Sequence, residues 1–359
     1  MGKLKIVIIN LTLLITGLIL LEIGIRIFID YEPGYYTGVQ SKNNCIQYPF
    51  GEICLNSDGY PDDEFDLKGE KLRIGYFGDS VCYGTGAGKG YRITDLLEKY
   101  YKKYEHYNFC YIGENVLSNK TLDKLIKVAK KYDLNRIVYL MNMNDIPPLT
   151  SEFTQWPPGV STMKNTGAKS QEQTPHTRNI LVEIKMLITP LDEILRGKSY
   201  LYTYLRNKVK EKLTIAGYEA SGYKTIEMSP GKNDLTFKQA SERINSLQRI
   251  LNNMHKKFTL VILPYEMQIS TDAESKYRKL NIQWEEGFPD GSAQDLLIKN
   301  LSSNVAYFNT YNAFKDIKST AKIGEYFVYN KGDKIDWNHP NRQGHKIISG
   351  YLMDQSIYE

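Results

Sequence analysis

Short apolar runs alternate with amphipathic segments along much of the chain, and no other feature constrains the fold as strongly. Apolar runs of this length predict buried strands. They cover residues 72–77, 107–112, 136–143, 258–264 and 305–309. Helical spacing is found at residues 91–104, 121–132, 236–256 and 292–300, and in a last segment from about Asn341. Such alternation is typical of a parallel sheet between helices. The sequence therefore predicts a three-layer α/β/α domain with a five-stranded parallel sheet.

One segment interrupts the alternation after the third predicted strand. Residues 147–235 contain Pro147-Pro148, a second Pro pair, a polar stretch, and helical spacing near 179–197 and 199–214. The carboxyl ends of the strands are where ligands enter parallel α/β sheets. We therefore expect this insertion to cover the crevice and to govern substrate choice, and its removal should leave a folded core.

The first 30 residues are predicted to be a membrane anchor. Lys3 and Lys5 precede an apolar run that continues from Ile6 to Ile29. As a helix this run would be about 36 Å long at about 1.5 Å per residue, which is enough to cross a bilayer. Glu22 and Arg26 are four residues apart, so they can pair on one helix face near the far interface.

The basic start of the chain favours an N-terminus in the cytoplasm. A cleaved signal peptide and a buried helix of a soluble protein are the alternatives, but no small-x-small cleavage site follows the apolar run. The prediction is a single-pass membrane protein with its catalytic domain outside the cytoplasm. In this division residues 1–30 are the anchor, 31–70 a turn-rich membrane-proximal segment that would accommodate a hairpin, and 71–359 the α/β domain.

Four cysteines, an even number, permit two disulfides outside the cytoplasm. Cys45 and Cys54 flank a short turn-rich stretch and form one candidate pair. Cys82 and Cys110 are predicted to lie near each other, and a bond between them requires Cα atoms within about 7 Å. The chain has no Cys-x-x-Cys spacing, so a zinc ribbon or a thioredoxin-like site is not expected.

Charge and composition argue against a nucleic-acid partner. The net charge of +5 is spread along the chain and does not gather in blocks. The 28 tyrosines could stack on sugars, but Lys, Asn and Ile are also abundant, so a compositional bias explains them better.

Small or polar residues follow three of the predicted strands. Ser80 comes directly after Gly78-Asp79, Gly113 follows the second strand, and Asn144 follows the third. Ser80 would present its hydroxyl and N–H to the crevice, Gly113 would let a ligand approach its N–H, and Asn144 would supply an amide donor. Taken singly, each residue is equally well explained as a helix cap or a turn residue.

The stretch "DWNHPNRQGH", residues 336–345, holds two of the five histidines. A serine hydroxyl is a poor nucleophile unless a base takes its proton, and His339 can be that base for Ser80. Asp336 can accept a hydrogen bond from the other ring nitrogen and so hold the required tautomer. The N–H groups of Ser80 and Gly113 and the amide of Asn144 would form an oxyanion hole. The alternative is that the stretch only caps the last helix.

Together these motifs resemble the SGNH (GDSL-type) hydrolase family. The resemblance covers about residues 71–145 and 236–359, and the segment 56–63 is similar to membrane-anchored members. The motifs that carry it, in the family's order, are Gly78-Asp79-Ser80, Asn108-x-x-x-x-Gly113, Asn144-Asp145 and Asp336-x-x-His339-Pro340-Asn341. It implies a flavodoxin-like sheet, a catalytic triad of Ser80, Asp336 and His339, and an ester-cleaving or acyl-transferring activity.

Two residues depart from the family pattern. Asn142 stands where the third motif usually has Gly, and Cys110 occupies a position often held by Gly. Both positions bear on the shape of the oxyanion hole. If Asn142 distorts the hole, replacing it by Gly should raise activity.

The expected function is that of an extracytoplasmic serine esterase that removes or transfers acyl groups, acetyl above all, on a cell-surface or exported glycan. An O-acyltransferase of the same fold, a lipid esterase and a catalytically silent glycan-binding or assembly protein are the alternatives. The expected partners are the membrane, an acylated carbohydrate or other ester, and glycan-assembly proteins. No metal or other cofactor is expected, because Asp333, Asp336, His339 and His345 lack a recognised ligand spacing.

Overall fold

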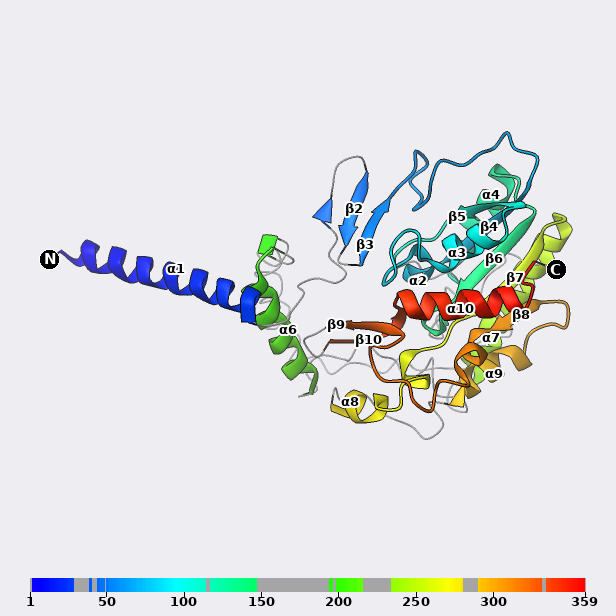
Figure 1. Cartoon of the computed structure of the whole chain (residues 1–359). Coiled ribbons are helices and arrows are strands. Elements are labelled where there is room, and N and C mark those ends of the chain that lie inside the picture. Colours follow the sequence, from blue (N-terminus) through cyan, green and yellow to red (C-terminus); the bar gives the residue numbers. More distant parts are fainter. Residues whose placement is uncertain are drawn as a thin grey trace.

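The computed structural model describes residues 2–28, 39–40, 44–48, 50–113, 117–146, 194–195, 198–215, 234–279, 290–330 and 334–358. The central sheet consists of β4 (Leu72–Gly78), β5 (Tyr104–Asn108), β6 (Arg136–Met141), β7 (Lys257–Ile262) and β8 (Ala306–Asn309). The strand order is β5-β4-β6-β7-β8, and every neighbouring pair is parallel (Figure 1). The predicted five-stranded parallel sheet is confirmed.

Helices cover both faces of this sheet. They are α3 (Ile93–Tyr100), α4 (Asn119–Lys131), α7 (Asp234–Asn253), α9 (Ser292–Lys299) and α10 (Arg342–Asp354). Side chains of α4, α7 and α9 share one buried cluster with Ile137 and Tyr139 of β6. Side chains of α3 and α10 share a second cluster with Tyr76 and Val138. Because successive strand residues point to opposite faces, the two clusters are the two sides of a three-layer α/β/α domain.

The second strand lies earlier in the sequence than predicted. The apolar run indicated residues 107–112, whereas β5 pairs with β4 from Tyr104 to Asn108. β5 is an edge strand and its first two residues are half-exposed, so its sequence lacks the continuous apolar run of a central strand. Phe109 and Cys110 follow it as buried residues at the carboxyl edge of the sheet.

A hairpin that the sequence did not predict carries the histidine stretch. β9 (Phe327–Asn330) and β10 (Lys334–Pro340) pair as antiparallel strands. Residues 336–340 are therefore part of a strand. Phe327 and Val328 are almost fully buried, so burial of β9 in the core, and not the polar sequence of β10, accounts for this hairpin. The side chain of Asn341 caps α10, as the alternative reading of the stretch required.

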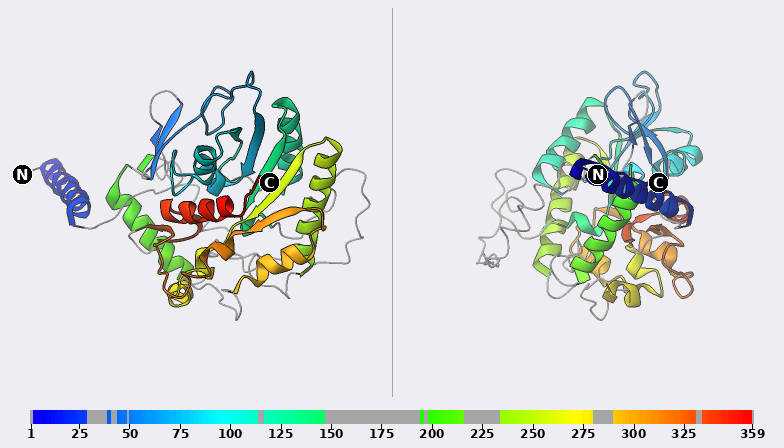
Figure 2. Two further views of the ribbon diagram at one scale, coloured as in Figure 1. Left: turned by 45° about the vertical axis from the view of Figure 1, so that its right-hand side comes forward. Right: turned by 90° about the vertical axis from the view of Figure 1, so that its left-hand side faces the viewer.

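The N-terminal helix α1 (Lys3–Phe28) projects away from the α/β domain (Figures 1 and 2). Its segment Leu4–Phe28 is long and apolar enough to cross a membrane, and its most apolar stretch is not buried by the rest of the protein; a signal sequence would share these properties. α6 (Tyr200–Ile215) lies between the end of α1 and the domain in Figure 1. The predicted helix near 179–197 lies outside the described residues, apart from the helical pair 194–195.

The membrane-proximal segment forms a small antiparallel sheet. Its strands are β1 (Val39–Gln40), β2 (Cys45–Tyr48) and β3 (Gly51–Cys54). Phe50 and Ile53 are buried in the same cluster as α3 and α10, and Tyr60 is buried in the other cluster. This segment thus packs on the α/β domain through both clusters.

Both cysteine pairings considered from the sequence are present as disulfides. Cys45 and Cys54 lie opposite each other on β2 and β3, with Cα atoms 3.9 Å apart. Cys82 and Cys110 are bonded with a Cα–Cα distance of 5.6 Å. The second bond connects the helix that follows β4 to the segment that follows β5.

Candidate active site

Ser80 stands at the turn between β4 and the short helix α2 (Ser80–Tyr83). Asp79 caps this helix, because its side chain accepts a hydrogen bond from the N–H of Val81 at 2.9 Å. A Cβ at Gly78 would lie 2.7 Å from the Leu140 carbonyl oxygen and from Cys82 Cβ, so only glycine fits there. The Gly-Asp-Ser sequence therefore has a local structural reason, and it holds the Ser80 hydroxyl at the carboxyl edge of the sheet.

His339 lies directly against Ser80. The distance between Ser80 Oγ and His339 Nε2 is 2.7 Å, although the two residues are 259 positions apart in the sequence. With a neutral imidazole protonated on Nδ1, Nε2 accepts the hydrogen bond that the hydroxyl donates. This is the geometry of a nucleophile and its general base.

Asp336 lies on β10, three residues before His339. Its side chain is outside the part of the structure that is described, so its role as the partner of Nδ1 stays a prediction. A different carboxylate lies close to the pair. Burial raises the pKa of Asp79 above its ordinary value, while the neighbouring His339 acts in the opposite direction. Sequence reasoning treated Asp79 only as part of the Gly-Asp-Ser motif and missed this proximity.

Asn144 lies beside the Ser80 turn, as the sequence predicts. It belongs to the 3-10 turn η1 (Met143–Asp145), which directly follows β6. Its side-chain Nδ2 lies 3.4 Å from Asp79 Oδ2, and the residue is exposed. An exposed amide next to the nucleophile turn can turn toward a bound substrate, which an oxyanion donor requires.

Gly113 lies five residues beyond the end of β5. Its φ of +76° is in the region that favours glycine, and a Cβ there would meet no atom within 4 Å. The segment before it runs along the end of β4, because the N–H of Phe109 donates to Tyr76 O at 2.9 Å and the N–H of Tyr111 to Gly78 O at 3.3 Å. Among the described contacts none joins Gly113 itself to Ser80, so its role as a donor stays a prediction.

Asn142 has a role that the sequence did not indicate. It is fully buried at the end of β6, and its Nδ2 donates to the carbonyl oxygen of Asn338 at 3.2 Å. Its Oδ1 accepts from the N–H of Met143 at 2.9 Å. Asn142 thus connects the sheet to the residue directly before His339, and a glycine at this position would lack both bonds.

Asn108 and the segment 56–63 support the same region from the other side. Asp62 accepts a hydrogen bond from the N–H of Asn108 at 2.7 Å. The Asn108 side chain donates to Cys82 O at 3.2 Å, and its Oδ1 accepts from the N–H of Cys110 at 3.0 Å. These bonds join the membrane-proximal segment, the edge strand and the helix that begins at Ser80.

His345, the other histidine of the stretch, is fully buried and lies within α10. Its Nδ1 accepts a hydrogen bond from the N–H of Ile93 at 3.1 Å, and burial lowers its pKa to about 3. A neutral imidazole that accepts from a backbone N–H connects α10 to α3. This contact gives His345 a structural role.

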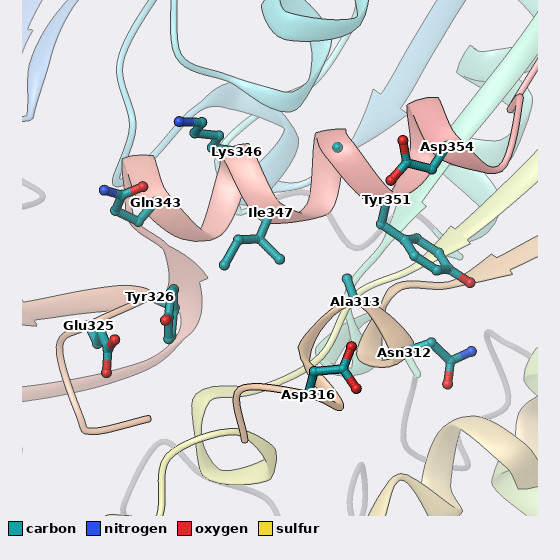
Figure 3. Close-up of a pocket in the computed structure, with 11 residues that line it drawn as sticks. Asn312, Ala313, Asp316, Glu325, Tyr326, Gln343, Lys346, Ile347, Tyr351 and Asp354 are labelled. Atoms are coloured by element: carbon teal, nitrogen blue, oxygen red, sulfur yellow. The ribbon is translucent and has the colours of Figure 1, made fainter. Parts of the chain in front are cut away.

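A hollow of about 670 Å³ lies over the outer side of α10 (Figure 3). It is lined by residues of η6 (Thr310–Phe314), of α10 and of the turn before β9, among them Glu325, Tyr326, Lys346 and Asp354, and by Asp316, which follows η6. None of the predicted site residues lines it. The hollow is therefore separate from the Ser80–His339 pair.

No protein-family model matches the sequence, and no curated protein matches it significantly. Several solved structures do match. One is a catalytic mutant of an acetylxylan esterase from Geobacillus stearothermophilus, with 13% identity, a TM-score of 0.38, and 82% of this chain and 98% of that chain covered. Another is a psychrotrophic esterase from Pseudoalteromonas sp., with 12% identity, a TM-score of 0.36, and coverages of 80% and 97%.

A third match is a GDSL-like lipase from Bacteroides thetaiotaomicron, with 13% identity, a TM-score of 0.32, and coverages of 79% and 87%. Similarities at these identities and TM-scores decide nothing about activity. The case for a catalytic role therefore rests on the residues of this chain and on their geometry.

Proposed function

We propose that this chain is a serine esterase of the SGNH type that removes or transfers ester-linked acyl groups on a cell-surface or exported glycan. The single observation that supports this best is the 2.7 Å contact between Ser80 Oγ and His339 Nε2 at the carboxyl edge of the sheet. Two separate motifs supply these residues, and each would be unremarkable alone.

The chemistry follows from this contact. His339 takes the proton of the Ser80 hydroxyl while Oγ attacks the ester carbonyl carbon, and the carbonyl oxygen becomes an oxyanion. The N–H groups of Ser80 and Gly113 and the Asn144 amide stabilise that charge. The C–O bond to the alcohol breaks, the alcohol oxygen takes the proton from His339, and Ser80 is left acylated. Water or a glycan hydroxyl then attacks the acyl group with His339 as base and releases Ser80. Asp336 stabilises the imidazolium through Nδ1.

The location rests on two supports. α1 can cross a membrane by its length and composition. The disulfides Cys45–Cys54 and Cys82–Cys110 suit an oxidising compartment, since disulfides persist outside the cytoplasm. We therefore propose that α1 is an uncleaved anchor and that the α/β domain lies outside the cytoplasm. The acetyl group and the glycan are inferred from this location and from the resemblance of the motifs.

A fluorophosphonate probe tests the proposal, because it forms a covalent bond only with an activated serine. The folded wild-type chain should be labelled, and Ser80→Ala should not be. The Ser302→Ala variant, which changes a serine outside the site, is the control and should be labelled as the wild type is. Absence of labelling in correctly folded protein would contradict the proposal and favour a silent glycan-binding protein. Comparing free acetate with acetylated acceptor in the products would then separate hydrolase from transferase.

A further inference from the structure

The junction between α1 and α6 has a polar network that the ester chemistry does not use. Glu22 of α1 accepts hydrogen bonds from the N–H groups of Tyr200 and Leu201, at 2.9 and 2.8 Å. It also accepts one from the Ser199 hydroxyl at 2.9 Å. A carboxylate at this position satisfies free N–H groups of the first turn of α6 and is favoured by the dipole of that helix.

Arg26 completes the junction. Its Nε donates to Glu22 at 2.8 Å, which confirms the predicted pairing of these two residues. Its Nη2 donates to Lys198 O at 3.1 Å, and the guanidinium lies 4.3 Å from the centre of the Tyr200 ring. Glu22 and Arg26, the two charged residues in the C-terminal half of α1, are thus bonded to each other and to the start of α6.

The position of this junction along α1 sets its depth in a bilayer. From Leu4 to Arg26 an α-helix rises about 33 Å, which compares with about 30 Å for the hydrocarbon core of a bilayer. If α1 spans the membrane, Arg26 therefore lies at the far boundary of the core. α6 begins at that level, and Figures 1 and 2 show it running obliquely away from the end of α1.

α6 has one face buried in the protein and one exposed. Thr203 is only 3% exposed, whereas Leu205 and Val209 are 51% and 56% exposed, and Lys212 is exposed as well. Leu205, Val209 and Lys212 are four and three residues apart, so they form one stripe on the side opposite Thr203. The helix also has four basic residues and one acidic residue, Glu211, and so carries a net charge of 4 − 1 = +3.

We propose that the Leu205–Val209 face of α6 lies on the surface of the bilayer, with its apolar side chains at the acyl-chain boundary and its basic residues among anionic headgroups. Exposed apolar residues beside a lysine, on a basic helix that starts at the membrane boundary, are features of a helix that lies in the interface plane. The inference rests on the proposed membrane span of α1. This second contact holds the α/β domain in one orientation on the membrane.

The native disulfides make a direct test simple. All four cysteines are paired, so a single introduced cysteine can be labelled alone under non-reducing conditions. The variants are Leu205→Cys on α6, Leu14→Cys on α1 and Leu235→Cys on α7; the three leucines are 51%, 59% and 54% exposed. Each full-length variant is labelled with an environment-sensitive fluorophore and reconstituted into anionic vesicles that contain lipids with a nitroxide quencher.

Labels at Leu14 and Leu205 should be quenched by the nitroxide lipid, and the label at Leu235 should not. Quenching at Leu14 without quenching at Leu205 would overturn the α6 inference and leave the anchor in place. Absence of quenching at Leu14 would overturn both. The emission spectrum of the label at Leu205 could report an apolar environment without quenching by the nitroxide lipid. That result would show that protein, such as a second copy of this chain, covers this face, and it would also overturn the inference.

A second variant tests the same face without a label on it. Here the label is placed on Lys212→Cys, and the same chain carries Leu205→Asp and Val209→Asp. These two changes remove the apolar stripe, so quenching of the label by the nitroxide lipid should fall by roughly half or more. Circular dichroism checks that the double variant is folded as the wild type is. Unchanged quenching would contradict the proposal. Absence of esterase activity in the wild type and in every variant would contradict the proposed function, but it would not contradict the contact of α6 with the bilayer.

Discussion

The side-chain amide of Asn142 donates a hydrogen bond to the carbonyl oxygen of Asn338, 3.2 Å away, and so connects the end of β6 to the residue directly before His339. At this position the sequence departs from the G-x-N-D pattern of the family that it resembles. The departure has a structural reason, because the amide holds the histidine segment against the sheet.

Replacing Asn142 by glycine should therefore lower kcat. We expect a loss of about tenfold, because misplacement of a catalytic group by as little as 1 Å can cost up to about 10²-fold. KM should change little. Steady-state kinetics on a small activated acetyl ester measure this, and Asn245→Gly, a change at a half-buried asparagine of α7 that bonds Asn300 and Ser302, is the control for general destabilisation. A higher kcat would instead show that Asn142 distorts the oxyanion hole.

The Ser80–His339 contact predicts that the two residues act as a unit. Ser80→Ala and His339→Ala should each abolish most turnover, by up to about 10⁶-fold if the pair behaves like well-studied ones, and the double variant should be scarcely worse than either. Asp336→Asn should keep the fold but favour the wrong tautomer of His339, with a loss of up to about 10⁴-fold. Circular dichroism checks folding. Full activity in Ser80→Ala would refute the mechanism.

Asn144→Ala should remove one oxyanion donor and leave the nucleophile in place. The expected loss is about 10²–10³ in kcat. Labelling of Ser80 by a fluorophosphonate should continue at a reduced rate, which distinguishes a lost donor from a lost nucleophile. Activity equal to that of the wild type would mean that the Asn144 amide contacts Asp79 but donates no hydrogen bond to the oxyanion.

The Cys82–Cys110 disulfide should matter more to activity than the Cys45–Cys54 disulfide. It connects the helix of Ser80 to the segment that leads to Gly113 and closes a loop with a sequence separation of 28, against 9 for the other bond. In the loop-closure entropy model, the disulfide of the longer loop stabilises the folded state by about 3–4 kcal/mol and that of the shorter loop by about 2–3 kcal/mol. Paired Cys→Ala variants, compared by denaturant unfolding and by kcat, test this. Equal loss of kcat in both would contradict it.

Glu266 should make folding stability depend on pH. The residue lies on η4 (Glu266–Gln268) after β7, and burial raises its pKa from 4.5 to about 8, although the Gly324 N–H donates to it at 2.9 Å. Between pH 4.5 and about pH 8 the folded state therefore binds more protons than the unfolded state. The contribution of Glu266 to the free energy of unfolding is present below pH 4.5 and is lost as pH rises through about 8.

Glu266→Gln should remove this dependence, because the amide can still accept from Gly324 and has no charge to desolvate. Relative to the wild type, the variant should gain stability at pH 9 and not at pH 5. Denaturant unfolding at both pH values measures the difference. An equal effect at both values would show that the carboxyl is not protonated in the folded state.

Much of the fold could be predicted from the sequence. β4, β6 and β7 were recognised because most of their residues are buried, which leaves nearly continuous apolar runs in the sequence. β8 is an edge strand with only Asn309 buried, and it was recognised from its short apolar run alone. β5 was placed too late, because an edge strand is half-exposed and the apolar run that follows it is buried outside the sheet. The predicted neighbourhood of Ser80 and Asn144 followed from the rule that the carboxyl ends of parallel strands share one edge.

The rest depended on contacts between distant parts of the chain. The β9–β10 hairpin, which carries His339, forms because Phe327 and Val328 are buried in the core, and a polar stretch read alone gives no sign of this. The bond from Asn142 to Asn338 and the capping of α6 by Glu22 join residues 196 and about 178 positions apart. Sequence patterns report which faces of a segment are apolar. Which polar groups meet across the molecule is decided only when the packed core brings their backbones together.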